Sequence, residues 1–126
     1  NNEDNRIQFA VAIDPAPVDV FQASTFSEVS IPVEIVNLGR PGKIPRTALA
    51  SEIAKAIPEG KYSTIEDASH YSMFGECKPG AAEIAESEQV GDPICSDGGG
   101  QSRLEIHNQL VNMVTEAFDR ELKTDR

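Results

Sequence analysis

The chain has 126 residues, of which 39% are hydrophobic, and this length and composition fit one small globular domain with a real core. It carries 21 acidic residues against 11 basic ones, which gives a formal net charge of −10. The lysines and arginines are scattered along the chain. Nucleic acid and anionic membrane surfaces are therefore excluded as expected partners, because both require basic patches, and no apolar run approaches the length of a membrane span.

Two strands are predicted in the first third of the chain. Residues 7–13 are almost continuously apolar and stop at Asp14-Pro15-Ala16-Pro17, which is typical of a strand buried on both faces. Residues 29–38 are rich in β-branched side chains and predict a second strand. Residues 18–28 show no sustained period, and we expect an excursion there with one helical turn at residues 25–28.

A helix and a third strand follow. Residues 39–45 contain two glycines and two prolines and predict a loop. Thr47 can cap a helix that runs to about residue 57, where Pro58 and Gly60 end it. Its apolar residues recur at every fourth position: Leu49, Ile53 and Ile57. Residues 62–66 predict the third strand, and the order strand, helix, strand indicates a βαβ unit with parallel strands.

His70 stands where this third strand gives way to a loop, which is where catalytic imidazoles are commonly mounted. We interpret it as a general base. The alternative is a histidine that is merely hydrogen-bonded at the surface or in the core. Tyr71, Met73 and Phe74 follow it directly, and they fit either the wall of an acyl or alkyl pocket or core anchors.

Residues 75–100 form a long loop with one possible helical turn at residues 81–85, and long loops in compact domains are usually functional or tied down. Cys77 and Cys95 lie near its two ends. A disulfide between them would close the loop and would indicate an extracytoplasmic protein. The alternative is two free thiols. Two cysteines without a matching pair of ligands make only half a zinc site, so we expect no metal.

The last element is predicted to be a helix that begins with a capping box at Ser102 and Glu105. Its apolar stripe is expected at alternating steps of three and four: Leu104, His107, Val111, Val114 and Phe118. His107 therefore lies on the stripe, and we interpret it as a packed, hydrogen-bonded histidine rather than a catalytic one.

The predicted elements look incomplete. Three parallel strands with one crossover helix and one final helix leave an edge of the sheet, and much of one face, without cover. The chain also begins with Asn1 rather than Met. We expect a processed subunit or a fragment that does not fold stably alone and that pairs with a complementary half.

The order of these motifs resembles the C-terminal half of an α/β-hydrolase. The motifs are the apolar strand ending in Asp14, the strand entering the Gly-Pro loop, the helix, and the strand ending at His70. Further details are similar to secreted or periplasmic dienelactone-hydrolase-like enzymes: Cys77, the run Ile94-Cys95-Ser96-Asp97, Arg103, and Ile106-His107. The resemblance spans residues 7–122.

This resemblance implies a triad of nucleophile, acid and histidine, with His70 as the histidine. The usual acid follows the second strand, but Gly42 stands near that position and the loop holds no Asp or Glu. Asp14, one strand earlier, is the substitute; otherwise it is a turn residue before Pro15. No G-x-S-x-G elbow is present, so the nucleophile and the oxyanion hole would come from a complementary N-terminal hydrolase chain or segment.

The expected function is hydrolysis of a small-molecule ester or related acyl bond, without a cofactor, in a secreted or periplasmic heterodimer. Two alternatives stay open. One is a noncatalytic hydrolase-like binding or structural protein, which Gly42 favours. The other is a self-sufficient small α/β domain of unrelated function.

Overall fold

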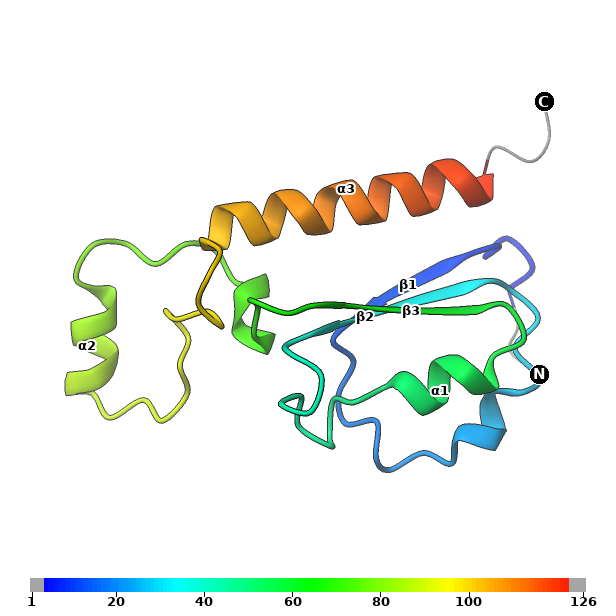
Figure 1. The fold of residues 1–126 in the computed structure, drawn as a ribbon, viewed down its shortest axis with the longest axis horizontal. Coiled ribbons are helices and arrows are strands. Elements are labelled where there is room, and N and C mark those ends of the chain that lie inside the picture. Colours follow the sequence, from blue (N-terminus) through cyan, green and yellow to red (C-terminus); the bar gives the residue numbers. More distant parts are fainter. Residues whose placement is uncertain (1–3, 123–126) are drawn as a thin grey trace.

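The computed structural model describes residues 4–122, and its centre is a three-stranded parallel sheet (Figure 1). The strands are β1 (Ala10–Ile13), β2 (Val33–Leu38) and β3 (Gly60–Ile65), in the spatial order β1-β2-β3. Because all three run in the same direction, their carboxyl ends lie at one edge of the sheet. The predicted α/β class with parallel strands is confirmed, although β1 and β2 are shorter than predicted.

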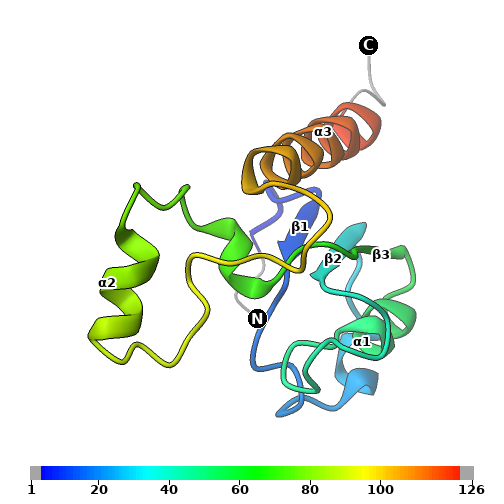
Figure 2. The same ribbon diagram turned by 60° about the vertical axis from the view of Figure 1, so that its left-hand side comes forward.

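The helices and 3-10 turns lie around this sheet. They are η1 (Ala23–Phe26), α1 (Ser51–Ala56), η2 (His70–Met73), α2 (Ala81–Ser87) and α3 (Arg103–Leu122). The two crossover elements, η1 and α1, cover one face of the sheet, and α3 lies across the other face (Figures 1 and 2). The crossover helix α1 and the final helix α3 therefore lie on opposite faces of the sheet.

Successive residues of β2 belong to two hydrophobic clusters on opposite faces of the sheet. Ile35 packs with the buried apolar residues of α1, and Val36 packs with those of α3. They are 3% and 1% exposed, respectively. This alternation follows from the two-residue period of a strand, and it makes β2 the central, most buried strand of the sheet.

The helix α1 is shorter than predicted. It begins at Ser51, with Ala50 as its N-cap, rather than at a cap on Thr47. The amides of Ala48 and Leu49 both donate to the carbonyl of Pro45 at 2.9 Å, so residues 45–49 form a separate turn. Leu49 consequently leaves the predicted stripe and is 41% exposed, whereas Ile53 and Ile57 are buried as predicted.

Helix α1 lies very close to the start of β3. A Cβ atom on Gly60 would be 2.1 Å from the carbonyl oxygen of Ala54, so any side chain there would push the helix off the sheet. The glycine that was expected to end the helix thus also sets the distance between helix and sheet.

The predicted apolar stripe of α3 is wrong by one residue. The buried positions are Arg103, Ile106, Leu110 and Ala117. Leu104 and Val111, from the predicted stripe, are 54% and 61% exposed. The helix carries two adjacent apolar rows with the same spacing, and the row of Ile106 and Leu110 packs on Val36 of β2. The capping box at Ser102 is confirmed, because its hydroxyl accepts from the amide of Glu105 at 3.3 Å and its own amide donates to the Glu105 carboxylate at 2.7 Å.

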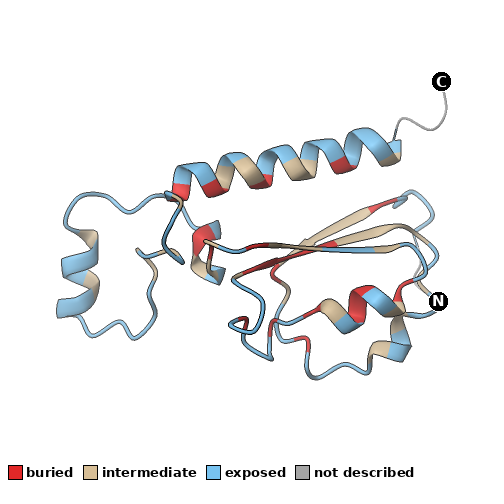
Figure 3. Cartoon of the chain, viewed as in Figure 1, coloured by how far each residue is buried: buried red, intermediate tan, exposed pale blue. Residues whose placement is uncertain are grey.

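Residues 75–100 form an arm that extends away from the sheet and carries α2 (Figure 1). No residue of α2 is buried (Figure 3). The possible helical turn predicted there is a seven-residue helix, and it makes no core. No helix among residues 4–122 is long and apolar enough to cross a membrane.

Candidate active site

Asp14 is the first residue after β1 and is only 3% exposed. Its backbone has φ 45°, in the left-handed region that aspartate enters more readily than most residues. Its amide still donates to the carbonyl of Val36 at 2.7 Å, so the residue is anchored to β2 as the chain turns away. This turn directs the side chain toward the carboxyl end of the neighbouring strand.

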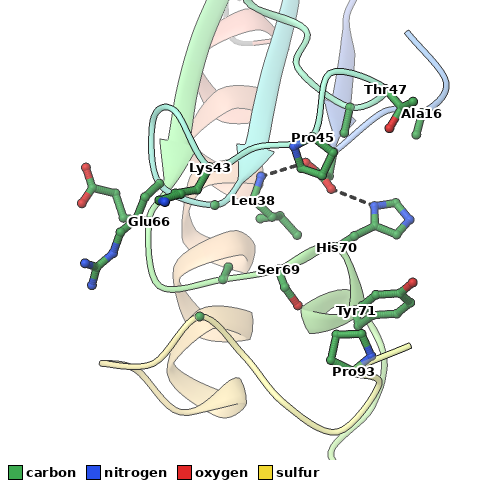
Figure 4. Close-up of a pocket in the computed structure, with 16 residues that line it drawn as sticks. Ala16, Leu38, Lys43, Pro45, Thr47, Glu66, Ser69, His70, Tyr71 and Pro93 are labelled. Atoms are coloured by element: carbon green, nitrogen blue, oxygen red, sulfur yellow. Dashed lines mark hydrogen bonds and ion pairs between the residues drawn. The ribbon is translucent and has the colours of Figure 1, made fainter. Parts of the chain in front are cut away.

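The buried carboxylate of Asp14 accepts three hydrogen bonds. Its Oδ1 accepts from the amide of Leu38 and from Nδ2 of Asn37, both at 2.9 Å. Its Oδ2 lies 2.7 Å from Nδ1 of His70 (Figure 4). A buried carboxylate is costly unless donors surround it, and here backbone, amide and imidazole donors share that task.

His70 stands at the first position of η2, five residues after β3 ends. Because an ionised carboxylate can only accept, Nδ1 of His70 carries the proton in its bond to Asp14, and in the neutral form of the ring Nε2 has the lone pair. Among residues 4–122, no group is hydrogen-bonded to Nε2. The His70 side chain is 47% exposed, whereas that of Asp14 is 2% exposed. The pair thus has a buried acid and an accessible base.

Hydrogen bonds of Ser72, which is fully buried, hold the turn that carries His70. The Ser72 hydroxyl accepts from the amide of Ser69 at 2.8 Å and donates to Asp97 at 2.6 Å. Its carbonyl accepts from Nε2 of His107 on α3 at 2.6 Å. His107 therefore binds the backbone two residues beyond His70, which agrees with its interpretation as a packed, hydrogen-bonded histidine.

A cavity of about 540 Å³ opens next to the Asp14 and His70 pair. Figure 4 shows Pro45 and Thr47 on one side of the His70 ring, with Tyr71 and Pro93 on the other side. Tyr71 lies on η2 and Pro93 on the arm, so the wall is shared between the sheet edge and the arm. The volume is in the range of small-molecule sites.

Tyr71 is influenced by an acid of the arm. Hydrogen bonding to Asp92 is the main cause that raises the pKa of Tyr71 above its ordinary value, and burial is the second cause. Asp92 directly precedes Pro93 in the chain, so this influence comes from the part of the arm that lines the cavity.

The arm is closed on itself by a disulfide and is attached to the rest of the chain by hydrogen bonds. The predicted disulfide between Cys77 and Cys95, which both lie in the arm, is confirmed, with Cα atoms 5.6 Å apart. One attachment is the buried guanidinium of Arg103, at the start of α3. It donates to Asp97 at 3.1 Å, and to the carbonyls of Gly75 at 3.2 Å and Ile94 at 2.8 Å, so it holds both ends of the arm.

The loop at residues 39–45 contributes no acid to the pair. Gly42, where the resemblance places the usual acid, is exposed and has φ +79°. The arrangement instead brings together the two residues that the sequence singled out, Asp14 and His70, although 56 positions separate them. Their catalytic role stays a prediction.

Sequence reasoning missed Asn37 and the structural role of Arg103. A polar residue inside the apolar run of residues 35–38 was a usable signal, because a buried strand residue that can hydrogen-bond needs partners. Within residues 4–122, no cluster of three or more histidine, cysteine or acidic side chains could hold a metal ion. Comparisons of the chain with family models, curated proteins and solved structures find no match.

Proposed function

We propose that the chain is the part of an ester or related acyl hydrolase that supplies the histidine and the acid of a catalytic triad. The observation that carries this proposal is the hydrogen bond from His70 to the buried carboxylate of Asp14, with Nε2 of the ring left to face a nucleophile. An imidazole oriented by a buried acid beside a small-molecule cavity is the arrangement that activates a serine hydroxyl.

In the proposed reaction, Nε2 of His70 removes the proton from a serine hydroxyl as its oxygen attacks the substrate carbonyl. Collapse of the tetrahedral adduct breaks the bond to the leaving alcohol, which takes that proton from Nε2. A water molecule then repeats the two steps and releases the acid product. Asp14 keeps the proton on Nδ1 and stabilises the imidazolium form. No oxidant, metal or cofactor is needed for this balance.

The nucleophile would come from a complementary segment whose strand extends the sheet at β1. The amides of Ala10 and Asp14 donate to the carbonyls of Pro32, just before β2, and Val36, so by the two-residue period those of Val11 and Ile13 point to the opposite side. No strand among residues 4–122 pairs with that side. β1 contains no charged residue, which is unlike the edges that proteins protect against pairing.

The outward apolar row of α3, which comprises Leu104, Val111 and Phe118, favours the same location for the partner. Phe118 packs edge-on against Phe9, just before β1, with ring centroids 5.2 Å apart. The exposed row is therefore continuous with the start of the unpaired strand. A segment that adds a strand beside β1 would bring its carboxyl end next to Asp14 and His70 and could cover this row.

The disulfide supports an extracytoplasmic location, because such bonds persist in oxidising compartments. Secretion or export to a periplasm is the localisation that we propose with this function.

The test compares two histidine variants in material isolated from the source with any polypeptide that stays bound. Intact-mass and native-gel measurements first identify that polypeptide, and hydrolysis is then measured on a panel of small esters. We expect His70→Ala to lose several orders of magnitude in turnover. The control is His107→Ala, which should mainly lower thermal stability. Full activity in His70→Ala would refute the hydrolase proposal. An inactive assembly with a serine at the partner's elbow would instead favour a noncatalytic binding protein.

A further inference from the structure

We infer that Asn37 is a positioning residue that orients the Asp14 carboxylate toward His70; this inference rests on the proposed function. Asn37 lies on β2 and is completely buried, at 0% exposure. Its Nδ2 donates to Oδ1 of Asp14 at 2.9 Å, on the side of the carboxylate away from His70.

The orientation of the Asn37 amide is fixed by its partners. Nδ2 also donates to the carbonyl of Ala48 at 2.7 Å, and Oδ1 accepts from the amide of Ala50 and the hydroxyl of Tyr62, both at 3.0 Å. The two groups near Nδ2 can only accept, and the amide of Ala50 near Oδ1 can only donate, so a flipped amide would lose its bonds. The four hydrogen-bonding positions of the side chain are thus filled.

Tyr62 supplies one of the two donors to Oδ1 of Asn37, at the end of the amide away from Asp14. Burial, and secondly the charge on Asp14, raise the pKa of Tyr62 above its ordinary value. The hydroxyl therefore stays protonated through neutral pH and continues to donate to Asn37.

These bonds determine which carboxylate oxygen of Asp14 faces His70. Two donors, Asn37 and the amide of Leu38, occupy Oδ1, which leaves Oδ2 for Nδ1 of His70. Rotation of the carboxylate would break both bonds to Oδ1 inside the core. Asn37 acts on the imidazole through this carboxylate, and it does not itself touch His70.

A purely structural role for Asn37 is the competing explanation, since its bonds to Ala48 and Ala50 also tie the entry of α1 to β2. The two explanations differ in what happens at His70. If Asn37 only holds α1, a folded variant should leave the His70 tautomer and the turnover unchanged. If it orients Asp14, both should change while the fold persists.

The decisive variant is Asn37→Asp, which keeps the size of the side chain and an acceptor for Ala50 and Tyr62 but replaces the donor that faces Asp14. Nitrogen-15 NMR of His70, recorded on the complete assembly, should show loss of the dominant tautomer protonated at Nδ1. Turnover should fall by about 10- to 100-fold, which is the size of effect seen when a side chain that orients an active-site residue by a hydrogen bond is replaced. The matched control is Tyr62→Phe, which removes a donor from the opposite end of the same amide and should preserve the tautomer.

If Asn37→Asp does not fold, the unaltered protein and the variant Asp14→Asn still test the inference. The side-chain amide protons of Asn37 should be protected from exchange, and their signals should shift in Asp14→Asn. Unprotected amide protons, or an unchanged His70 tautomer in folded Asn37→Asp, would refute the positioning role. An assembly without ester hydrolysis whose His70 tautomer still responds to Asn37→Asp would refute only the proposed function.

Discussion

Two regions of the molecule are held in place in different ways. One is the sheet edge with Asp14 and His70, and the other is the arm at residues 75–100. At the sheet edge, Asp14 and Asn37 are buried and bound to each other, and their positions follow from strand pairing and from the packing of β2. The arm has no core, since no residue of α2 is buried, and it depends on its own disulfide and on hydrogen bonds to the rest of the chain, such as those of Arg103 and Ser72. One cavity has walls from both regions.

The two regions therefore have different proposed tasks: one carries the triad residues, and the other shapes the cavity. Asp14 and His70, the proposed triad residues, lie at the carboxyl end of the sheet, whereas Pro93, which only lines the cavity, belongs to the arm. Changes at the sheet edge should therefore alter turnover without unfolding the protein. Changes at the arm's attachments should alter stability and substrate fit while leaving the bond between Asp14 and His70 intact.

The largest expected effect is at the sheet edge. Asp14→Asn should cut turnover by about 10⁴, because the imidazole would then be held in the wrong tautomer. The fold should persist, since the new side chain has the same size. Turnover of the assembly on its best ester, with circular dichroism as a check of folding, measures this effect. Asp19→Asn, at an exposed acid in the same connection, is the control and should behave as the unaltered protein. Full activity in folded Asp14→Asn would remove Asp14 from the triad but leave His70 in it.

An intermediate effect is expected at the arm's buried attachment. Arg103→Met should lower the free energy of unfolding by about 3–5 kcal/mol, because it leaves the Asp97 carboxylate without its cation and removes the Arg103 donors from three backbone carbonyls. Urea unfolding of the assembly measures this loss. The control is Arg40→Met, whose 60% exposed side chain pairs with Asp67 at the surface and should cost less than about 1 kcal/mol. Equal losses in both variants would show that Arg103 does not tie the arm to the body.

The sequence predicted those parts of the fold whose signals are local. The capping box at Ser102, the parallel strands and the disulfide were all readable from short patterns. The row of α3 that packs on the sheet could not be predicted in this way, because two adjacent apolar rows have the same period. Only the shape of the sheet decides which row is buried. Similarly, the pairing of Asn37 with Asp14 depends on the register of β1 against β2, which no local pattern encodes.

The smallest expected effect is a local loss of stability at the start of α3 in acid, which should leave the sheet unchanged. Hydrogen bonds from Ser102, first its amide and then its hydroxyl, hold the pKa of Glu105 below its ordinary value of 4.5. The stabilisation that this capping box gives to α3 is therefore complete above pH 4.5 and is lost as the pH falls through the lower pKa of the folded state. Hydrogen exchange at the first turn of α3 should quicken in that acid window, whereas the amides of β2 should stay protected. In Glu105→Gln the acid-dependent step should disappear, since the glutamine side chain does not titrate. A step that persists in this variant would show that the acid sensitivity of the first turn does not arise from Glu105.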